Sequence, residues 1–164
     1  MSDPGLKHVF DRLSYNLTRD RLVQQTTYEL RNYLNVDRLV LYYFYRKWEG
    51  QVTFESISSQ QFSILGSTGP DDCFNGEYAA LYEAGRVSAI AEITKAPIAE
   101  CHRNFLSKLQ VKANLVVPIL PPKGLWGLLV AHHCQNTRLW SDEDIQIMQQ
   151  KAKTLAETAA IRES

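Results

Sequence analysis

Two of the three cysteines stand beside residues that can exchange protons or carry charge. Cys73 lies in the run Asp71-Asp72-Cys73-Phe74, and Cys101, 28 positions after Cys73, is followed at once by His102. A thiol beside a proton acceptor can become a thiolate, the form that attacks electrophiles and binds metals. The two thiols therefore leave metal binding, a disulfide and nucleophilic catalysis open.

The spacing of these residues weighs against a metal site and against an enzyme. Metal sites usually show short paired spacings such as Cys-x-x-Cys, and this chain has none. A thiol enzyme needs a base that meets the nucleophile in space and a third group that orients the base, which adjacent residues such as Cys101 and His102 seldom supply. We therefore expect neither a metal nor an enzyme that acts on other molecules.

Length and charge narrow the class of protein. The 164 residues correspond to about one domain, so we expect a single domain over 1–164. Lys plus Arg and Asp plus Glu both total 18, and this balance gives no overall field that would recruit nucleic acid or an anionic membrane. With three cysteines and no secretory signal, we expect a cytoplasmic protein with free thiols. The longest apolar run, 125–131, is far shorter than the ~20 residues that cross a bilayer.

Helical periodicity opens and closes the chain. Ser2-Asp3-Pro4 is a helix-start signal, and apolar residues then recur at three- to four-residue spacing, with a break near 18–20. Ser141 and the three acidic residues after it cap a final helix. The apolar stripes predicted for these helices are Val9, Leu13, Leu17, Leu22, Thr26, Leu30 and Tyr33, and then Ile145, Met148, Ala152, Leu155, Ala159 and Ile161.

Between these helices the composition predicts an antiparallel sheet. Residues 38–45 and 52–57 read as a hairpin, and 111–120 and 124–134 read as the two central strands, separated by Pro121-Pro122-Lys123. The remaining expected segments are a long loop with one short strand over 58–75, a short helix over 78–83 that ends near Gly85, an apolar piece over 87–93, and a helix over 98–109 that carries Cys101. The fold class is therefore α+β.

Long runs of this sequence resemble the chromophore-binding GAF domain of cyanobacteriochromes. The Asp71-Asp72-Cys73-Phe74 run is similar to the Asp-X-Cys-Phe motif of a two-cysteine, blue/green-type subgroup of that family. The other matching runs are Cys101-His102, Leu106, Gln110 to Ile119, Leu125 to Leu129 and Ala131 to Cys134. The resemblance implies an α/β/α sandwich with a central antiparallel sheet of about five or six strands, excised from a longer multidomain photoreceptor.

The resemblance also implies a chromophore and a photochemical cycle. The expected ligand is a linear tetrapyrrole (bilin), phycocyanobilin or its isomer phycoviolobilin, held by a stable thioether from Cys101 to the side chain of its first ring. Cys73 is expected to add reversibly to the central methine bridge, which shortens the conjugated system and moves absorption to the blue. Light would isomerise the double bond to the last ring from Z to E and release Cys73, which restores green absorption. Violet/green, blue/orange and blue/teal pairs of states fit the same motif. Catalysis would be limited to attaching, and isomerising, this ligand.

The same resemblance assigns roles to residues around the ligand. It implies that Asp71 accepts hydrogen bonds from pyrrole N–H groups, that His102 lies near the middle rings and that His132 lies near the last ring. His132 and His133 are neighbours on a strand, so only one of them can face a given pocket. Phe74 is expected as a pocket wall.

Further residues are expected beside the ligand or in the core. Arg86 is the best placed cation for a propionate of the tetrapyrrole, since a guanidinium fork suits a carboxylate. Tyr82 is expected in the chromophore pocket or in the plain core, and Trp126 and Tyr78 in the plain core. Cys134 is expected as a buried structural thiol.

In this family the domain is part of a signal-transduction protein. The terminal helices are expected to cover the sheet, and also to form a homodimer contact and continue into an output domain, with phototaxis receptors among the common hosts. The full-length receptor is then cytoplasmic or membrane-associated. The alternative is a GAF domain without photochemistry that binds a cyclic nucleotide or another small ligand.

Overall fold

The computed structural model describes residues 4–46, 49–69 and 76–164. The helices are α1 (Pro4–Arg19), α2 (Arg21–Leu34), α3 (Gly76–Glu83), α4 (Glu100–Lys108), α5 (Asp142–Ala156) and α6 (Ala159–Arg162), with 3-10 turns η1 (Gln60–Phe62) and η2 (Ile93–Lys95). The strands are β1 (Arg38–Arg46), β2 (Glu49–Ile57), β3 (Ser88–Ile90), β4 (Ala113–Ile119) and β5 (Gly127–His133). The predicted hairpin and the two predicted central strands are confirmed within two or three residues at each end.

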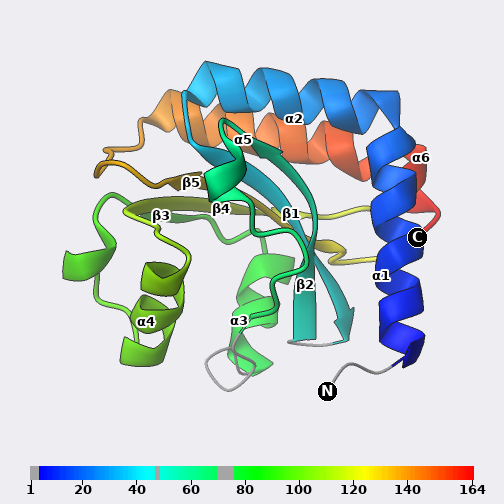
Figure 1. Cartoon of the computed structure of the whole chain (residues 1–164), viewed down its shortest axis with the longest axis horizontal. Helices are drawn as coiled ribbons and strands as arrows, with labels where there is room; N and C mark the ends of the chain where they lie inside the picture. Colours follow the sequence, from blue (N-terminus) through cyan, green and yellow to red (C-terminus); the bar gives the residue numbers. More distant parts are fainter. Residues whose placement is uncertain (1–3, 47–48, 70–75) are drawn as a thin grey trace.

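One antiparallel sheet of five strands, in the order β2-β1-β5-β4-β3, forms the middle layer. Helices α2 and α5 lie side by side on one face of this sheet, whereas α3 and α4 lie on the other (Figure 1). Helix α1 crosses the edge of the molecule beside β2 (Figure 1). The α/β/α arrangement expected from the sequence is therefore confirmed, with five strands.

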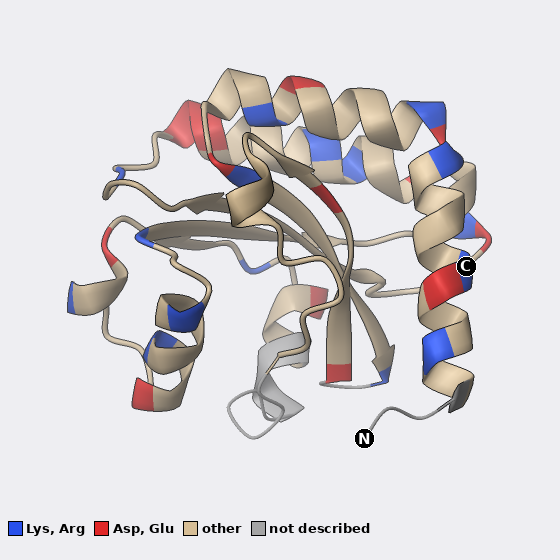
Figure 2. Cartoon of the chain, viewed as in Figure 1, with Lys and Arg blue, Asp and Glu red and all other residues tan. Residues whose placement is uncertain are grey.

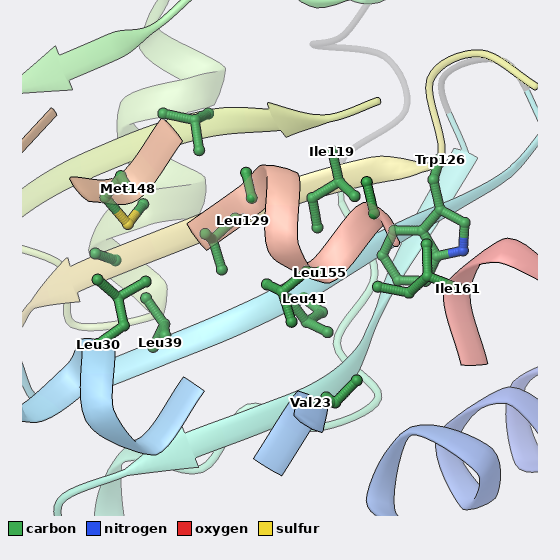
Figure 3. Close-up of a cluster of buried hydrophobic side chains, with 14 of the residues drawn as sticks. Val23, Leu30, Leu39, Leu41, Ile119, Trp126, Leu129, Met148, Leu155 and Ile161 are labelled. Carbon is green, nitrogen blue, oxygen red and sulfur yellow. The ribbon is translucent and has the colours of Figure 1, made fainter. Parts of the chain in front are cut away.

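The three inner strands are apolar on both faces, because helices cover both faces of the sheet. Successive side chains of a strand point to opposite faces, so neighbouring residues enter different clusters. Leu39, Leu41 and Leu129 pack under α2 and α5 with Met148 and Leu155 (Figure 3). The residues between them face the other way and form a second cluster, which contains Val40, Val116 and Val130. This second cluster lines the cavity described below.

The predicted break between the first two helices is confirmed at Asp20. Its carboxylate caps α2 by accepting hydrogen bonds from the backbone N–H groups of Leu22 and Val23. Two members of the predicted apolar stripe are wrong, because Leu22 and Tyr33 are 46% and 59% exposed. The restart at Asp20 sets the phase of α2, and the face that meets the sheet and α5 carries Val23, Thr26, Leu30 and Leu34 instead.

The predicted final helix is two helices. Helix α5 begins at the expected cap, where Ser141 and Asp144 form a capping box, and it ends at Ala156. Thr158 is buried in extended conformation and donates from its hydroxyl to the carbonyl of Leu155, which ends the α-helical ladder before α6 begins. Ala159 was predicted in the buried stripe and is exposed, because α6 restarts the helical phase.

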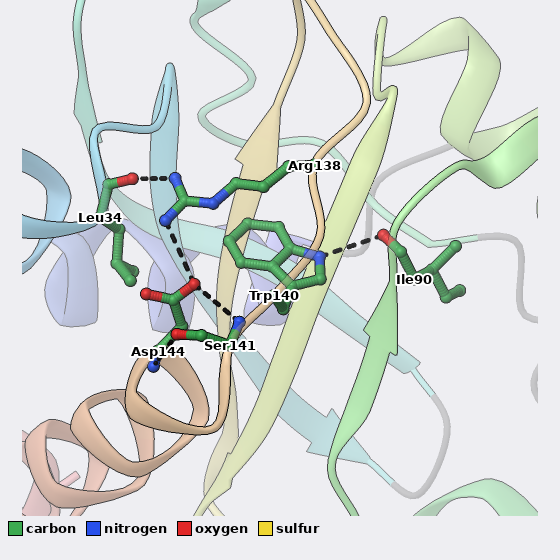
Figure 4. A network of polar contacts seen from close by, with 6 residues as sticks. All are labelled: Leu34, Ile90, Arg138, Trp140, Ser141 and Asp144. Atoms are coloured by element: carbon green, nitrogen blue, oxygen red, sulfur yellow. Dashed lines mark hydrogen bonds and ion pairs between the residues drawn. The ribbon is translucent and has the colours of Figure 1, made fainter.

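A polar network fixes the segment between β5 and α5 against two other elements (Figure 4). Arg138 donates to the carbonyl of Leu34 at the end of α2 and to Oδ2 of Asp144 at 3.2 Å. Trp140 donates from Nε1 to the carbonyl of Ile90 in β3 at 3.1 Å. The edge strand β3 is thereby held beside β4 although it is only three residues long.

Basic and acidic residues both occur along the helices (Figure 2). The long loop expected over 58–75 is described as far as residue 69, and over that part it holds η1 and a single bridge between Gln51 and Thr68 rather than a strand.

Within the described ranges, no helix is both long and apolar enough to cross a membrane.

Candidate functional site

A cavity lies between the sheet and the helices α3 and α4, on the face opposite α2 and α5. It has about 800 Å³ of empty space, including its open mouth. Its walls are mostly aliphatic and aromatic, with a few polar groups among them. Ligand pockets of small molecules commonly have this composition. The main lining residues are Val40, Tyr42, Phe44, Val52, Ile64, Tyr82, His102, Phe105, Leu106, Asn114, Val116, Leu128, Val130 and His132.

Three polar residues form a row across the inner strands on the cavity side. Arg38 of β1 is the register partner of His132 of β5, and His132 is the register partner of Asn114 of β4. Partners in an antiparallel sheet point to the same face, with Cβ atoms roughly 5 Å apart. All three residues are buried, at 1%, 4% and 3% exposure. A polar row of this kind inside an apolar sheet face requires a compensating set of hydrogen bonds.

Arg38 has that set. Its guanidinium donates to the carbonyls of Phe62 and Leu109, both at 2.8 Å, and its Nη1 lies 3.2 Å from Nδ1 of His132. Burial lowers the pKa of Arg38, and the charges of Cys134, Glu55 and then Asp37 oppose this shift. An arginine remains protonated in proteins, so it can only donate to His132.

His132 is consequently a neutral imidazole with a known tautomer. Burial, with a smaller contribution from Arg38, lowers the pKa of His132 to about 3. Because Nδ1 must accept from Arg38, the ring proton resides on Nε2. His132 therefore supplies an N–H donor on the wall of the cavity. Its neighbour His133 points to the other face, where Nδ1 accepts from the backbone of Asn136 at 3.2 Å.

Asn114 is the unsatisfied member of the row. Its side-chain Oδ1 is buried without a hydrogen-bond partner in the described part of the chain. An unpaired buried polar atom costs roughly 1–3 kcal/mol, so such atoms in native proteins call for a partner such as a ligand. Sequence reasoning missed Asn114 and Arg38 as site residues. The available signal was a polar side chain at the start of each of two strongly apolar strands.

Helix α4 carries two of the predicted site residues, Cys101 and His102. His102 lines it and is half-buried, and its pKa is lowered by burial and, to a smaller extent, by the charge of Arg86. Cys101 is exposed and lies four residues before Phe105, which lines the cavity, so both occupy the same face of α4. Cys101 is disulfide-bonded in this structure, which contradicts the expectation that all thiols are free.

Helix α3 and the turn after it supply Tyr82 and Arg86. Tyr82 is buried and lines the cavity, and the Arg86 guanidinium carbon lies 5.7 Å from the centre of the Tyr82 ring. Gly85, between them, has φ +96°, a left-handed conformation that glycine adopts without strain and that ends the helix. The chain reversal brings the Arg86 guanidinium close to the ring of cavity-lining Tyr82.

The remaining predicted residues fall into two groups. Asp71, Cys73 and Phe74 lie outside the described residues. Cys134 is a free buried thiol, as predicted, and burial raises its pKa. Trp126 is confirmed as a core residue, since it packs in the cluster under α2 and α5 rather than in the cavity. The structure thus brings Tyr82, His102 and His132 together around one cavity, with Arg86 beside it.

The sequence matches the GAF domain family over residues 18–159. The chain belongs to that family. As a GAF domain it shares 49% identity with an uncharacterized protein of Picosynechococcus sp., over 95% of this chain and 96% of that protein. It is also 29% identical to the circadian input-output histidine kinase CikA of Synechocystis sp., over 92% of this chain but 23% of the kinase. The domain thus spans nearly all of the first relative and under a quarter of the second.

Two solved GAF domains share its architecture. The blue-light absorbing form of the PixJ GAF domain of Thermosynechococcus elongatus has a TM-score of 0.75 and 33% identity, covering 85% of this chain and 84% of that one. The phycocyanobilin-bound GAF domain of a cyanobacterial phytochrome has a TM-score of 0.73 and 29% identity, covering 94% and 93%. The strong similarity to the PixJ domain agrees with the resemblance to cyanobacteriochromes drawn from the sequence.

Proposed function

We propose that this GAF domain is a photosensory module that binds a linear tetrapyrrole covalently and converts reversibly between two coloured states. The observation that carries the proposal is the cavity itself, in which an apolar wall surrounds a neutral histidine donor and an unsatisfied amide next to the helix that bears Cys101. A long conjugated ligand needs apolar walls for its ring faces and a few polar groups for its pyrrole and lactam edges. The phycocyanobilin held by a structural relative supports the same ligand class.

Cys101 is the proposed permanent attachment point. Its thiol adds across the exocyclic double bond of the first ring, so that sulfur bonds to one carbon and the thiol proton goes to the other. The four-residue spacing between Cys101 and cavity-lining Phe105, which puts both on one helix face, supports this role. Because Cys101 is disulfide-bonded here, attachment requires a reduced thiol.

Cys73 is the proposed reversible attachment point, as in the Asp-X-Cys-Phe subgroup that the sequence resembles. Its sulfur adds to the central methine carbon while its proton goes to a pyrrole nitrogen, and the sp3 carbon that results divides the conjugated system. The reverse reaction restores the longer system. Light-driven Z to E isomerisation at the last ring is proposed to displace the bridge from Cys73, giving a blue/green pair of states.

The other side chains are proposed to hold the ligand. His102 on α4 lies near the middle rings, and His132 near the last ring. Arg86, a cation beside the buried ring of Tyr82, suits one of the two propionates. Asp71 is proposed to accept from pyrrole N–H groups and Phe74 to form part of the wall. The chain's only catalysis would be attachment, and isomerisation of phycocyanobilin to phycoviolobilin.

The domain is proposed to work inside a longer receptor. Its relative CikA carries a matching segment over only 23% of its length and is named as a histidine kinase. The terminal helices α1 and α6 contact one another. A displacement of one helix would therefore be passed to the other. An output domain, a homodimer through these helices, and a phototaxis signal are parts of this proposal.

Co-expression with a bilin-producing pathway, under reducing conditions, tests the proposal. We expect a coloured protein whose absorption changes reversibly on alternating blue and green light. Denaturation in acid, followed by an absorption spectrum, then distinguishes phycocyanobilin from phycoviolobilin and Z from E. A correctly folded, reduced protein that stays colourless would refute the proposal and favour a GAF domain for another small ligand.

A further inference from the structure

The loop that follows β2 turns back and runs along the outer edge of that strand. Val52 of β2 exchanges backbone hydrogen bonds with Gly66 and Ser67, both at 2.9 Å. The carboxylate of Glu55, also in β2, accepts from the backbone N–H of Ile64 at 2.8 Å. Because β2 stands at the end of the strand order, the loop pairs with its outer side. These bonds fix the path of the loop up to Ser67.

The next anchor of the loop comes from a different strand, β1. The backbone N–H of Gly69 donates to the hydroxyl of Tyr42 at 3.0 Å. Gly69 is the last residue that the structure describes before 76, where α3 begins. Cys73, the proposed reversible attachment point, lies four positions after Gly69. The hydroxyl of Tyr42 therefore holds the chain at the point from which the Cys73 segment starts.

The ring of Tyr42 is itself held in place. It lines the cavity and meets the ring of Phe44 edge to face, with centroids 5.4 Å apart and planes at 82°. On the neighbouring strand stands Gly50, where a Cβ atom would lie 2.3 Å from Cε1 of Tyr42, closer than any real side chain comes. The glycine thus leaves the space that the ring fills. A ring confined in this way presents its hydroxyl at one defined place.

We propose that Tyr42 is a positioning residue for the reversible addition of Cys73, because it anchors the start of the Cys73 segment at the cavity wall through the hydrogen bond from Gly69. The inference rests on the proposed function, in which the sulfur of Cys73 bonds to the central methine carbon and its proton goes to a pyrrole nitrogen. Addition within one chain depends on the effective concentration of the thiol at the carbon that it attacks. Without the anchor the chain beyond Gly69 has more conformations open to it, so the equilibrium moves toward the free thiol.

The test compares Tyr42→Phe with a matched control, Tyr43→Phe. The first change keeps the ring and removes only the acceptor of Gly69. Tyr43 is the next residue of β1 and points to the opposite face, where it packs against the core under α2 and α5. Both full chains, and the unchanged one, are co-expressed with the phycocyanobilin pathway under reducing conditions.

Iodoacetamide measures how often the thiol of Cys73 is released, because it alkylates the free thiol irreversibly. In the dark the trapping rate is read as loss of blue absorption. It is divided by the rate in the green-absorbing state, read as loss of the ability to return to blue. We expect Tyr42→Phe to raise this ratio by about 2- to 10-fold, the range that corresponds to one net hydrogen bond. Tyr43→Phe should leave the ratio unchanged.

Direct contact of Tyr42 with the ligand is the alternative, and a second substitution separates it from anchoring. Gly69→Pro removes the donated N–H without touching the ring. We expect it to raise the trapping ratio as Tyr42→Phe does, and the double variant to show no further rise. Effects that multiply in the double variant would overturn the positioning role. Should Gly69→Pro fail to fold, the spectra of Cys73→Ala with and without Tyr42→Phe decide: identical spectra support anchoring, and a shifted maximum overturns it.

A role in stability alone would leave the trapping ratio where it is. Tyr42→Phe with an unchanged ratio therefore overturns the inference, even if its melting temperature falls. Pigment retained on a denaturing gel, which reports the bond to Cys101, should be the same in all folded variants. An unchanged chain that stays colourless or lacks a blue state overturns the proposed function and this inference with it. A blue state that is indifferent to Tyr42→Phe overturns the positioning role only.

Discussion

Arg38 and His132, 94 positions apart in the sequence, are register partners on adjacent strands, and their side chains meet with Nη1 of Arg38 3.2 Å from Nδ1 of His132. Burial is the main reason that the imidazole is neutral, and this contact selects its tautomer. Because the guanidinium can only donate, the neutral ring carries its proton on Nε2. A neutral N–H donor on the cavity wall suits a hydrogen-bond acceptor on the edge of a ligand rather than an anion.

Replacing Arg38 by methionine should destabilise the ligand-free domain strongly. The change leaves two buried carbonyls, of Phe62 and Leu109, and Nδ1 of His132 without their donor. Unpaired buried acceptors of this kind cost roughly 1–3 kcal/mol each, so a loss on the order of 3 kcal/mol is expected. Denaturant unfolding measures it, with Lys95→Met as control.

Lys95 suits that control because its side chain is 81% exposed and its ion pair with Glu92 spans 3.8 Å. Exposed pairs contribute at most about 1 kcal/mol, and often nothing measurable. Equal stabilities of the Arg38 and Lys95 variants would contradict the structural role assigned to Arg38.

Stability should rise with pH through the acidic range because of His132. Its pKa falls to about 3 in the folded domain, chiefly through burial, against an ordinary value near 6.5. Between these values the unfolded chain binds a proton that the folded chain does not, so stability is lost as pH falls below about 6.5, by at most ~1.4 kcal/mol per pH unit. His132→Gln, which keeps an acceptor for Arg38, should flatten this slope in urea unfolding between pH 6 and 4.

The exposed His8 of α1 provides the comparison for that slope. His8→Gln should leave the pH dependence of unfolding as it is in the unchanged chain. Were the two histidine variants to show the same slope, the neutral state of His132 would not be the source of the effect.

Cys101→Ala should abolish stable attachment of the bilin, reducing pigment on a denaturing gel to background, because the thioether can no longer form. Cys134→Ala is the matched control: this thiol is buried and free, and burial raises its pKa, which disfavours the reactive thiolate. Zinc-dependent fluorescence of the gel band measures both. Pigment that stays with Cys101→Ala through denaturation would contradict the assigned attachment point.

Cys73→Ala should retain attachment and lose the blue-absorbing state. Without the second thiol no sulfur reaches the central methine bridge, so the conjugated system stays long in both photostates. Absorption spectra before and after illumination measure the result, and a blue state that survives in this variant would exclude the reversible thioether.

The sequence alone determined the elements that depend on local signals. The break at Asp20, the capping box of Ser141 and Asp144, the hairpin and the two inner strands all follow from caps, turns and periodicity within a few residues. The family likewise followed from contiguous runs of residues, and the GAF match over 18–159 confirms it at that level.

Only the tertiary structure decided which faces and which polar groups matter. Leu22 and Tyr33 fit a helical stripe, yet the packing of α2 on the sheet and α5 buries Val23 and Leu34 instead. The row of Arg38, His132 and Asn114 joins β1 to the much later strands β4 and β5. The tautomer of His132 depends on that long-range contact with Arg38. A residue's burial and partners are set by long-range strand register, which no local pattern contains.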